Sequence, residues 1–271
     1  AMLIFAVIIA AYVIAGGLKG VMFTDALQGT IMFIGMVILV IYTYVQLGGF
    51  VGAHQALTDL AYKVPEALQQ KGHQGWTSMP EFFSVWWWVL VSTIILGVGI
   101  GVLAQPQLVV RFMTVKSRRE LNRAVFVGGI FILITTGVSY VVGSLSNVWF
   151  MNEAGQIAVE AAEGNADNII PLYIASAMPE WFGAVFMVTL LAAAMSTLSS
   201  QFHAMGTAMS RDIILQLAGP MKKDRTVLIT RLAIFFEIVI VVFLGFKLPG
   251  NIIARGTAIF FGLCASTFLP I

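Results

Sequence analysis

Seven apolar stretches follow one another along the chain, and each predicts a membrane-spanning helix. A spanning helix needs about 20 apolar residues, and the stretches combine such a length with few interior charges. They cover about residues 1–15, 22–47, 84–108, 124–148, 181–209, 227–246 and 252–271. The pattern therefore predicts an all-α integral membrane protein, with residues 1–271 forming part of a single transmembrane domain.

Composition supports a membrane protein and excludes a soluble domain. Of the 271 residues, 59% are hydrophobic and 10% are charged, far less charge than a soluble domain of this size carries. The net charge of +2 gives no reason to expect a nucleic-acid partner. The lone Cys264 rules out an internal disulfide and a thiolate metal cluster. Both ends lie inside apolar runs, so we interpret the chain as a piece truncated at both ends.

Charges in the connections predict the orientation in the membrane. Basic residues crowd two short connections: Arg111, Lys116, Arg118, Arg119 and Arg123 in one, and Arg211, Lys222, Lys223 and Arg225 in the other. Positively charged connections stay on the cytoplasmic side, whereas the acidic segments 48–83 and 149–180 are expected outside.

Residues 191–201 place several hydroxyls inside an otherwise apolar span. On a helix, Ala193, Ser196, Thr197 and Ser200 share one face, because they are spaced i, i+3, i+4 and i+7. Hydroxyls and freed carbonyls are ligands for a hard cation. The alternative is structural, because such hydroxyls bond back to the carbonyl one turn earlier and small residues let helices pack closely. The stretch alone favours packing.

Three motifs, in order along the chain, resemble those of the sodium:solute symporter family. Residues 195–201 (MSTLSSQ) followed by 210–212 (SRD) resemble its signature helix. Residues 16–25 (GGLKGVMFTD) with Gln28, and residues 105–112 (QPQLVVRF), fit as well. The resemblance covers nearly the whole chain. It implies a LeuT-like fold of ten core helices in two inverted halves of five, of which this chain holds the middle and later part.

The resemblance also implies a function. We expect sodium-coupled symport of a small organic solute, a carboxylate or amino acid, by alternating access in a bacterial or archaeal plasma membrane. Sodium is expected at the hydroxyls of Ser196 and Thr197 and the carbonyl of Ala193, with further ligands on a helix outside this chain. Expected partners are the solute and the lipid bilayer, with no organic cofactor and no enzymatic activity. The oligomeric state stays open.

The third stretch is expected to be a broken helix. Residues 96–106 hold three glycines, a glutamine and a proline, and non-helical backbone at membrane depth is tolerated only against protein or a wet cavity. Close helix packing through glycine is an equal alternative. In the resembling family this helix lines the substrate cavity, which predicts roles for Val98, Gly101, Val102 and Gln105. The first three offer no hydrogen-bonding side chain, which disfavours a sugar.

Two acidic residues lie within apolar stretches. Asp25 with Gln28 three residues later is spaced as a capping box, and an acid is favourable at a helix N-terminus. The resemblance associates the same aspartate with sodium leaving toward the cytoplasm. Glu237 lies mid-span, where an acid is a functional hypothesis by default. It departs from the family pattern, and its role stays open between proton coupling and a structural role in which it is paired inside the bundle.

Other functions are less well supported by the sequence. A channel would need a pore-lining filter or charge ring, which the sequence does not show. A membrane serine hydrolase would need a general base near its nucleophile. His203 is two turns from Ser196, about 10 Å along a straight helix, which is too far for direct contact. It is only one turn from Ser199 and Ser200, but no third group supports it as a base. A sensor that keeps the transporter fold also stays open.

Overall fold

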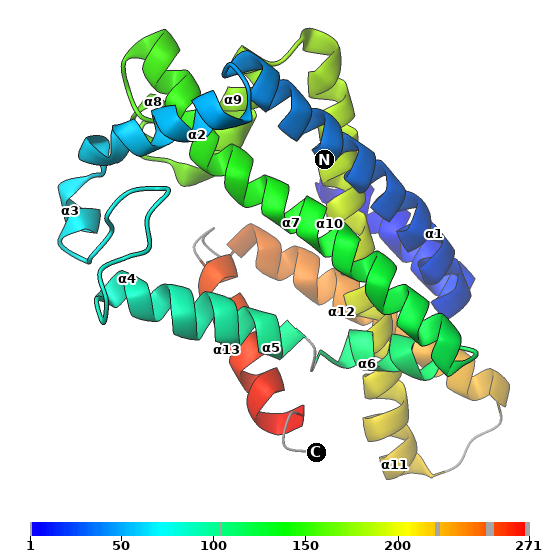
Figure 1. The fold of residues 1–271 in the computed structure, drawn as a ribbon. Coiled ribbons are helices and arrows are strands. Elements are labelled where there is room, and N and C mark those ends of the chain that lie inside the picture. Colours follow the sequence, from blue (N-terminus) through cyan, green and yellow to red (C-terminus); the bar gives the residue numbers. More distant parts are fainter. Residues whose placement is uncertain (1, 103–104, 220–222, 248–251, 269–271) are drawn as a thin grey trace. The chain divides into compact units, whose positions relative to one another are not determined.

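The computed structural model describes residues 2–102, 105–219, 223–247 and 252–268. Within these ranges the regular structure is entirely helical (Figure 1). Four described helices are long and apolar enough to cross a membrane, judged by length and composition: Leu3–Gln46, Arg118–Ala154, Glu180–Ala218 and Arg225–Lys247. The expected all-α fold of a multi-pass membrane protein is therefore observed.

The first two predicted helices are joined in one element, α1 (Met2–Gln46), which is kinked at Gly17. Gly17 has φ of 56° and ψ of −157°, a conformation that glycine adopts without steric cost. The interruption that the sequence places between residues 15 and 22 is thus a kink at one residue. The helix resumes directly after it.

The third predicted helix is divided. Its parts are α4 (Val85–Trp88), the π-helical η2 (Val89–Val98), α5 (Gly99–Gly101) and α6 (Pro106–Met113). Gln105, directly before α6, has an extended backbone, and residues 103–104 of the predicted helix lie outside the described residues. Pro106 is the first residue of α6, where its missing N–H costs no hydrogen bond. π-helical turns often lie at functional sites. The stretch is therefore irregular, as its glycines and proline predict.

The other predicted spans correspond to single long helices. They are α7 (Arg118–Ala154), α10 (Glu180–Ala208), α12 (Lys223–Lys247) and α13 (Ile252–Phe268). Beyond α10 the chain continues through the π-helical η5 (Met209–Ile214) into α11 (Leu215–Ala218). Shorter elements fill the two long connections: α2 (Phe50–Asp59), η1 (Leu60–Lys63), α3 (Glu66–Gln69), α8 (Ala158–Ala161), η4 (Ala166–Asn168) and α9 (Ile169–Ala177).

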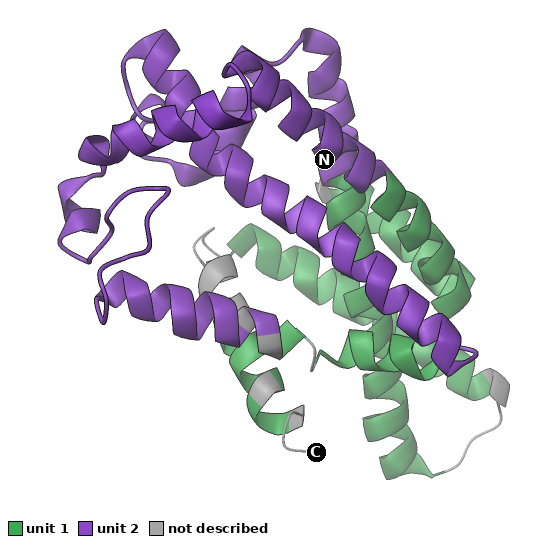
Figure 2. Cartoon of the chain, in the orientation of Figure 1, with its two compact units in different colours: residues 1–30, 101–114, 191–271 green, residues 31–100, 115–190 purple. Residues whose placement is uncertain are grey.

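The chain divides into two compact units, coloured separately in Figure 2. Unit 1 comprises Ala1–Thr30, Gly101–Thr114 and Leu191–Ile271, and unit 2 comprises Ile31–Ile100 and Val115–Leu190. The helices α1 and α10 each contribute residues to both units.

Unit 2 has a buried core between the second part of α1, α7, α9 and the start of α10. Tyr173 of α9 is fully buried, and its phenol donates a 3.0 Å hydrogen bond to the hydroxyl of Thr43, which is also fully buried. Burial raises the pKa of the Tyr173 phenol, so it remains the protonated donor. The Thr43 hydroxyl in turn donates to the carbonyl of Leu39 at 2.9 Å, so both buried hydroxyls have hydrogen-bond partners.

Unit 1 has its core where residues on both sides of the Gly17 kink in α1 meet α10 and α12. The buried apolar residues are Ile9, Val13, Val21, Phe202, Ile234 and Ile238. Gly206 of α10 permits a close approach, because a Cβ there would lie 2.2 Å from Cγ1 of Ile234 and 3.3 Å from its backbone nitrogen. This packing holds α10 close to α12.

Candidate cation site

Asp25 lies inside α1 and is bound by residues from two other helices of unit 1. Its side chain is 13% exposed and forms an ion pair with Arg111 of α6. The Ser199 hydroxyl donates to Oδ1 at 3.1 Å and the Ser200 hydroxyl to Oδ2 at 3.0 Å. Arg111 also donates a hydrogen bond to the Ser200 hydroxyl. Three distant segments therefore meet at one carboxylate.

The prediction of a capping box at Asp25 and Gln28 is wrong. The second part of α1 begins directly after Gly17, so Asp25 stands well inside the helix and no free N–H groups need capping there. Its carboxylate is used by Arg111 and two serines instead. Gln28 Oε1 is buried and has no hydrogen-bond partner among the described residues.

The three predicted sodium ligands lie together on α10. The hydroxyls of Ser196 and Thr197 each donate to the carbonyl of Ala193 at 3.0 Å. Thr197 is exposed, whereas Ala193 and Ser196 are partly buried. The bonds are those of the structural alternative, back-bonding to the preceding turn. Their oxygen atoms are also the ones that the cation hypothesis requires, so the geometry is compatible with either.

Ser196 connects these ligands to Asp25. Its carbonyl oxygen lies 3.0 Å from the Ser199 hydroxyl and 2.9 Å from the Ser200 hydroxyl, the same two hydroxyls that bond Asp25. Each hydroxyl has one proton, which it shares between this carbonyl and the carboxylate. A continuous set of oxygen atoms therefore runs from Ala193 along α10 to the carboxylate of α1. Oxygen atoms are the ligands that hard cations prefer.

Two members of this cluster were not predicted from the sequence. Ser199 is fully buried. Its position in the hydroxyl-rich stretch 191–201 is the sequence feature that could have pointed to it. Arg111 was assigned to a cytoplasmic basic connection by its charge. The signal for Arg111 was its position directly after the apolar residues 108–110, where a membrane helix places charge only with a partner.

A cavity in unit 1 reaches the partners of Asp25. Its volume is about 890 Å³, and its lining residues come from α1, α6, α10, η5 and α12. Arg111 and Ser200 line it, and so do Arg211 and Asp212 of η5. The cavity therefore joins the partners of Asp25 to charged residues at the end of α10 that is predicted to face the cytoplasm.

The predicted substrate positions are placed in different surroundings. Gly101 is buried, and a Cβ there would lie 2.9 Å from the carbonyl oxygen of Phe261 in α13. Val102 is partly buried, and Gln105 Oε1 accepts a 2.7 Å hydrogen bond from Gln107. The backbone of Val98 belongs to η2, but its side chain lies outside the described residues. The surroundings of Gly101 are those of close helix packing.

A pair of glycine substitutions tests this packing. Gly101→Ala is expected to destabilise the protein by about 1–3 kcal/mol, because the backbone of α13 must move to admit the methyl group. Gly99→Ala is the matched control, since a Cβ at Gly99 meets nothing within 4 Å among the residues that the structure describes. It should be neutral or slightly stabilising, as alanine is the better helix former. Thermal unfolding in detergent measures both, and equal effects would contradict the contact.

Glu237 stands apart from this cluster, on α12. Its Oε2 atom is buried and has no hydrogen-bond partner among the described residues. It lines a cavity of about 420 Å³ whose other lining residues, from η5 and α12, are all apolar. An ionised carboxylate is costly in such surroundings unless it is paired.

The chain as a whole is similar to known membrane transport proteins. The fold is similar to that of a Na⁺-coupled sialic acid symporter solved in a substrate-bound, outward-open state with a novel Na⁺ site. The TM-score is 0.68 at 20% identity, covering 97% of this chain and 50% of that one. This likeness supports the expected LeuT-like fold. The family model of the sodium:solute symporter family matches residues 1–271, so the chain belongs to that family.

Curated relatives are transporters of several solutes. The chain is 28% identical to the sodium/pantothenate symporter of Haemophilus influenzae over 87% of this chain and 46% of that protein. It is 24% identical to the high-affinity proline transporter PutP of Bacillus subtilis, over 96% of this chain and 50% of that protein. The sodium/mannose cotransporter SLC5A10 of Bos taurus is 27% identical, over 84% of this chain and 40% of that protein. The chain thus spans about half the length of the curated relatives it matches.

Proposed function

We propose that the full-length protein is a secondary transporter that couples the movement of sodium to that of a small organic solute. Membership of the sodium:solute symporter family supports this proposal. The observation that carries it is the continuous set of oxygen atoms from Ala193 through Ser196 to Asp25. A membrane helix that collects these groups beside a carboxylate has the chemistry needed for a cation.

Sodium would be bound by the carbonyl of Ala193 and the hydroxyls of Ser196 and Thr197. The two hydroxyl oxygens each lie 3.0 Å from this carbonyl oxygen, so the three proposed ligand atoms are already close together. Thr197 is exposed on α10, so further ligands can approach the proposed ion from the face of α10 that carries Thr197. We propose that residues of the full-length protein beyond this chain provide them.

Asp25 would serve the release of sodium toward the cytoplasm. The carboxylate lies one step along the oxygen set from Ser196, through Ser199 and Ser200. Arg111 already neutralises it, so a sodium ion reaching Asp25 must compete with the guanidinium. Displacement of Arg111 would then open the way into the 890 Å³ cavity that Arg111 lines. Arg111 is thus proposed as the gate of the exit path.

The solute is proposed to be a small carboxylate or amino acid. Pantothenate and proline are the solutes named for two of the relatives. The proposed cavity positions Val98, Gly101 and Val102 offer no hydrogen-bonding side chain, so backbone groups and Gln105 would provide the polar contacts. This disfavours a solute with many hydroxyls.

Sodium binding tests the proposal without knowledge of the solute. Radioactive sodium should bind saturably to the purified full-length protein, and an excess of unlabelled sodium should displace it. An excess of potassium should displace it poorly, because a sodium site distinguishes the two ions by its size and by the number of its oxygen ligands. Absence of saturable binding would contradict sodium coupling.

Proton coupling through Glu237 is the second candidate. It is favoured by one observation, the buried Oε2 atom without a hydrogen-bond partner among the described residues, beside an apolar cavity. If sodium fails to bind, a pH gradient should drive uptake instead, and Glu237→Gln should abolish that uptake. If sodium does bind, Glu237→Gln should leave sodium affinity unchanged.

A further inference from the structure

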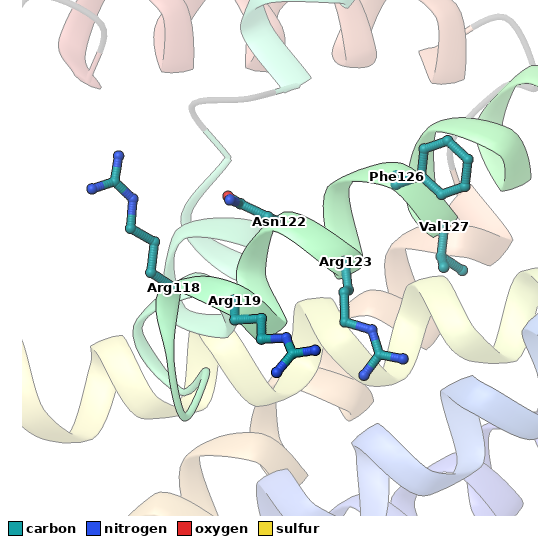
Figure 3. A pocket seen from close by; sticks show the side chains of 6 residues that line it. All are labelled: Arg118, Arg119, Asn122, Arg123, Phe126 and Val127. Carbon is teal, nitrogen blue, oxygen red and sulfur yellow. The ribbon is translucent and has the colours of Figure 1, made fainter.

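A compact group of arginines lies at the start of α7, the end of this helix that is predicted to face the cytoplasm. Arg118, Arg119 and Arg123 lie in its first two turns and line a shallow pocket of about 620 Å³ together with Asn122, Phe126 and Val127. Figure 3 shows the side chains of Arg119 and Arg123 extending in the same direction, with Arg118 on the other flank. All six residues belong to unit 2.

These residues form two parallel rows along the helix, because residues spaced i, i+4 and i+8 share a face. The rows are Arg118, Asn122 and Phe126, and Arg119, Arg123 and Val127. Each row changes from cationic at the helix end to apolar toward its middle. Phe126 is 71% exposed and Val127 is 64% exposed, so neither apolar side chain is covered within the described part of the chain.

The positive charge of the group is only partly neutralised. Arg123 pairs with Glu120 at 3.5 Å, with both side chains well exposed, and such a pair is weak. Arg118 and Arg119 are exposed and form no ion pair within the residues that the structure describes. An excess of two guanidinium groups therefore lies next to an exposed apolar surface.

We propose that this surface binds an anionic phospholipid, with its phosphate at Arg119 and Arg123 and an acyl chain along Phe126 and Val127. Guanidinium groups bind phosphate oxygens in a bidentate manner. A basic surface at the cytoplasmic end of a membrane helix attracts anionic lipid. A soluble phosphate would use the arginines but gain nothing from the apolar ends of the rows.

Photochemical labelling in vesicles tests the proposal. The full-length protein is reconstituted in phosphatidylcholine with a trace of phosphatidylglycerol that carries a photoreactive acyl chain. We expect labelling of residues 124–134, found by peptide mass spectrometry. Arg119→Gln/Arg123→Gln should lower this labelling by about tenfold or more, since each basic residue adds to the attraction. Arg119→Lys/Arg123→Lys should retain much of it.

Three controls distinguish a bound anionic lipid from free phosphate and from general contact with the bilayer. Lys63→Gln/Lys71→Gln removes the same charge from the connection predicted to face outward, and should leave the labelling unchanged. Unlabelled phosphatidylglycerol should compete, whereas inorganic phosphate should not. Equal labelling by a phosphatidylcholine probe, competition by inorganic phosphate, or no labelling of residues 124–134 in the wild-type protein would each overturn the proposal.

Discussion

Replacement of both Ser196 and Thr197 by alanine is expected to weaken sodium binding to the full-length protein by about 100-fold or more. The change removes two of the three proposed ligands on α10. A hydrogen bond or ligand contact to a charged group is worth about 1.5–3 kcal/mol, so two losses exceed two orders of magnitude in affinity. The Ala193 carbonyl remains, but without the hydroxyls that meet it at 3.0 Å.

Thr135→Ala is the matched control for this double variant. The Thr135 hydroxyl bonds back to the carbonyl of Phe131 at 2.7 Å, in the manner of Thr197, but lies on α7 in unit 2. Its removal should leave sodium affinity unchanged. Normal sodium binding by Ser196→Ala/Thr197→Ala, with both proteins folded, would assign these hydroxyls to helix packing alone.

Loss of Arg111 is expected to destabilise the protein more than loss of Asp25. In Arg111→Gln the Asp25 carboxylate keeps its two serine donors but loses its countercharge. Only 13% of the Asp25 side chain is exposed, so water compensates little for this loss. We expect a cost of about 1–3 kcal/mol, below that of a fully buried pair because Arg111 is 32% exposed. Asp25→Asn should cost less, because Arg111 can reach water through the cavity that it lines.

The double variant Asp25→Asn/Arg111→Gln distinguishes direct coupling from independent effects. It should be more stable than the sum of the single changes predicts, by about 0.5–3 kcal/mol, because no unpaired charge is left. Thermal unfolding of all four proteins in detergent gives this coupling energy. Strict additivity would show that the ion pair contributes nothing to stability, and the proposed gate would then lack its energetic basis.

The helical architecture could be predicted largely from sequence because a bilayer imposes few choices. Apolar stretches of sufficient length must be helical, since their backbone groups have no water to bond. The hydroxyl pattern of α10 was visible for a related reason, as helical spacing alone places Ala193, Ser196 and Thr197 on one face. The extent of each helix was less predictable, because whether residues 15–22 formed a loop depended on the backbone of Gly17.

The partners of Asp25 could be decided only by the tertiary structure. Its spacing to Gln28 fits a capping box, and local sequence cannot reveal that the helix already extends before it. Arg111 and Ser199 lie 86 and 174 residues away, and packing rather than sequence spacing brings them to the carboxylate.

The same division holds for the glycine at residue 101. Its sequence context leaves the neighbour of Gly101 open, and only the tertiary structure brings the carbonyl oxygen of Phe261 close to it. The sequence determined which helices form and which polar groups they carry, because those depend on local periodicity. The tertiary structure decided which of these groups meet, because such contacts depend on how distant segments pack.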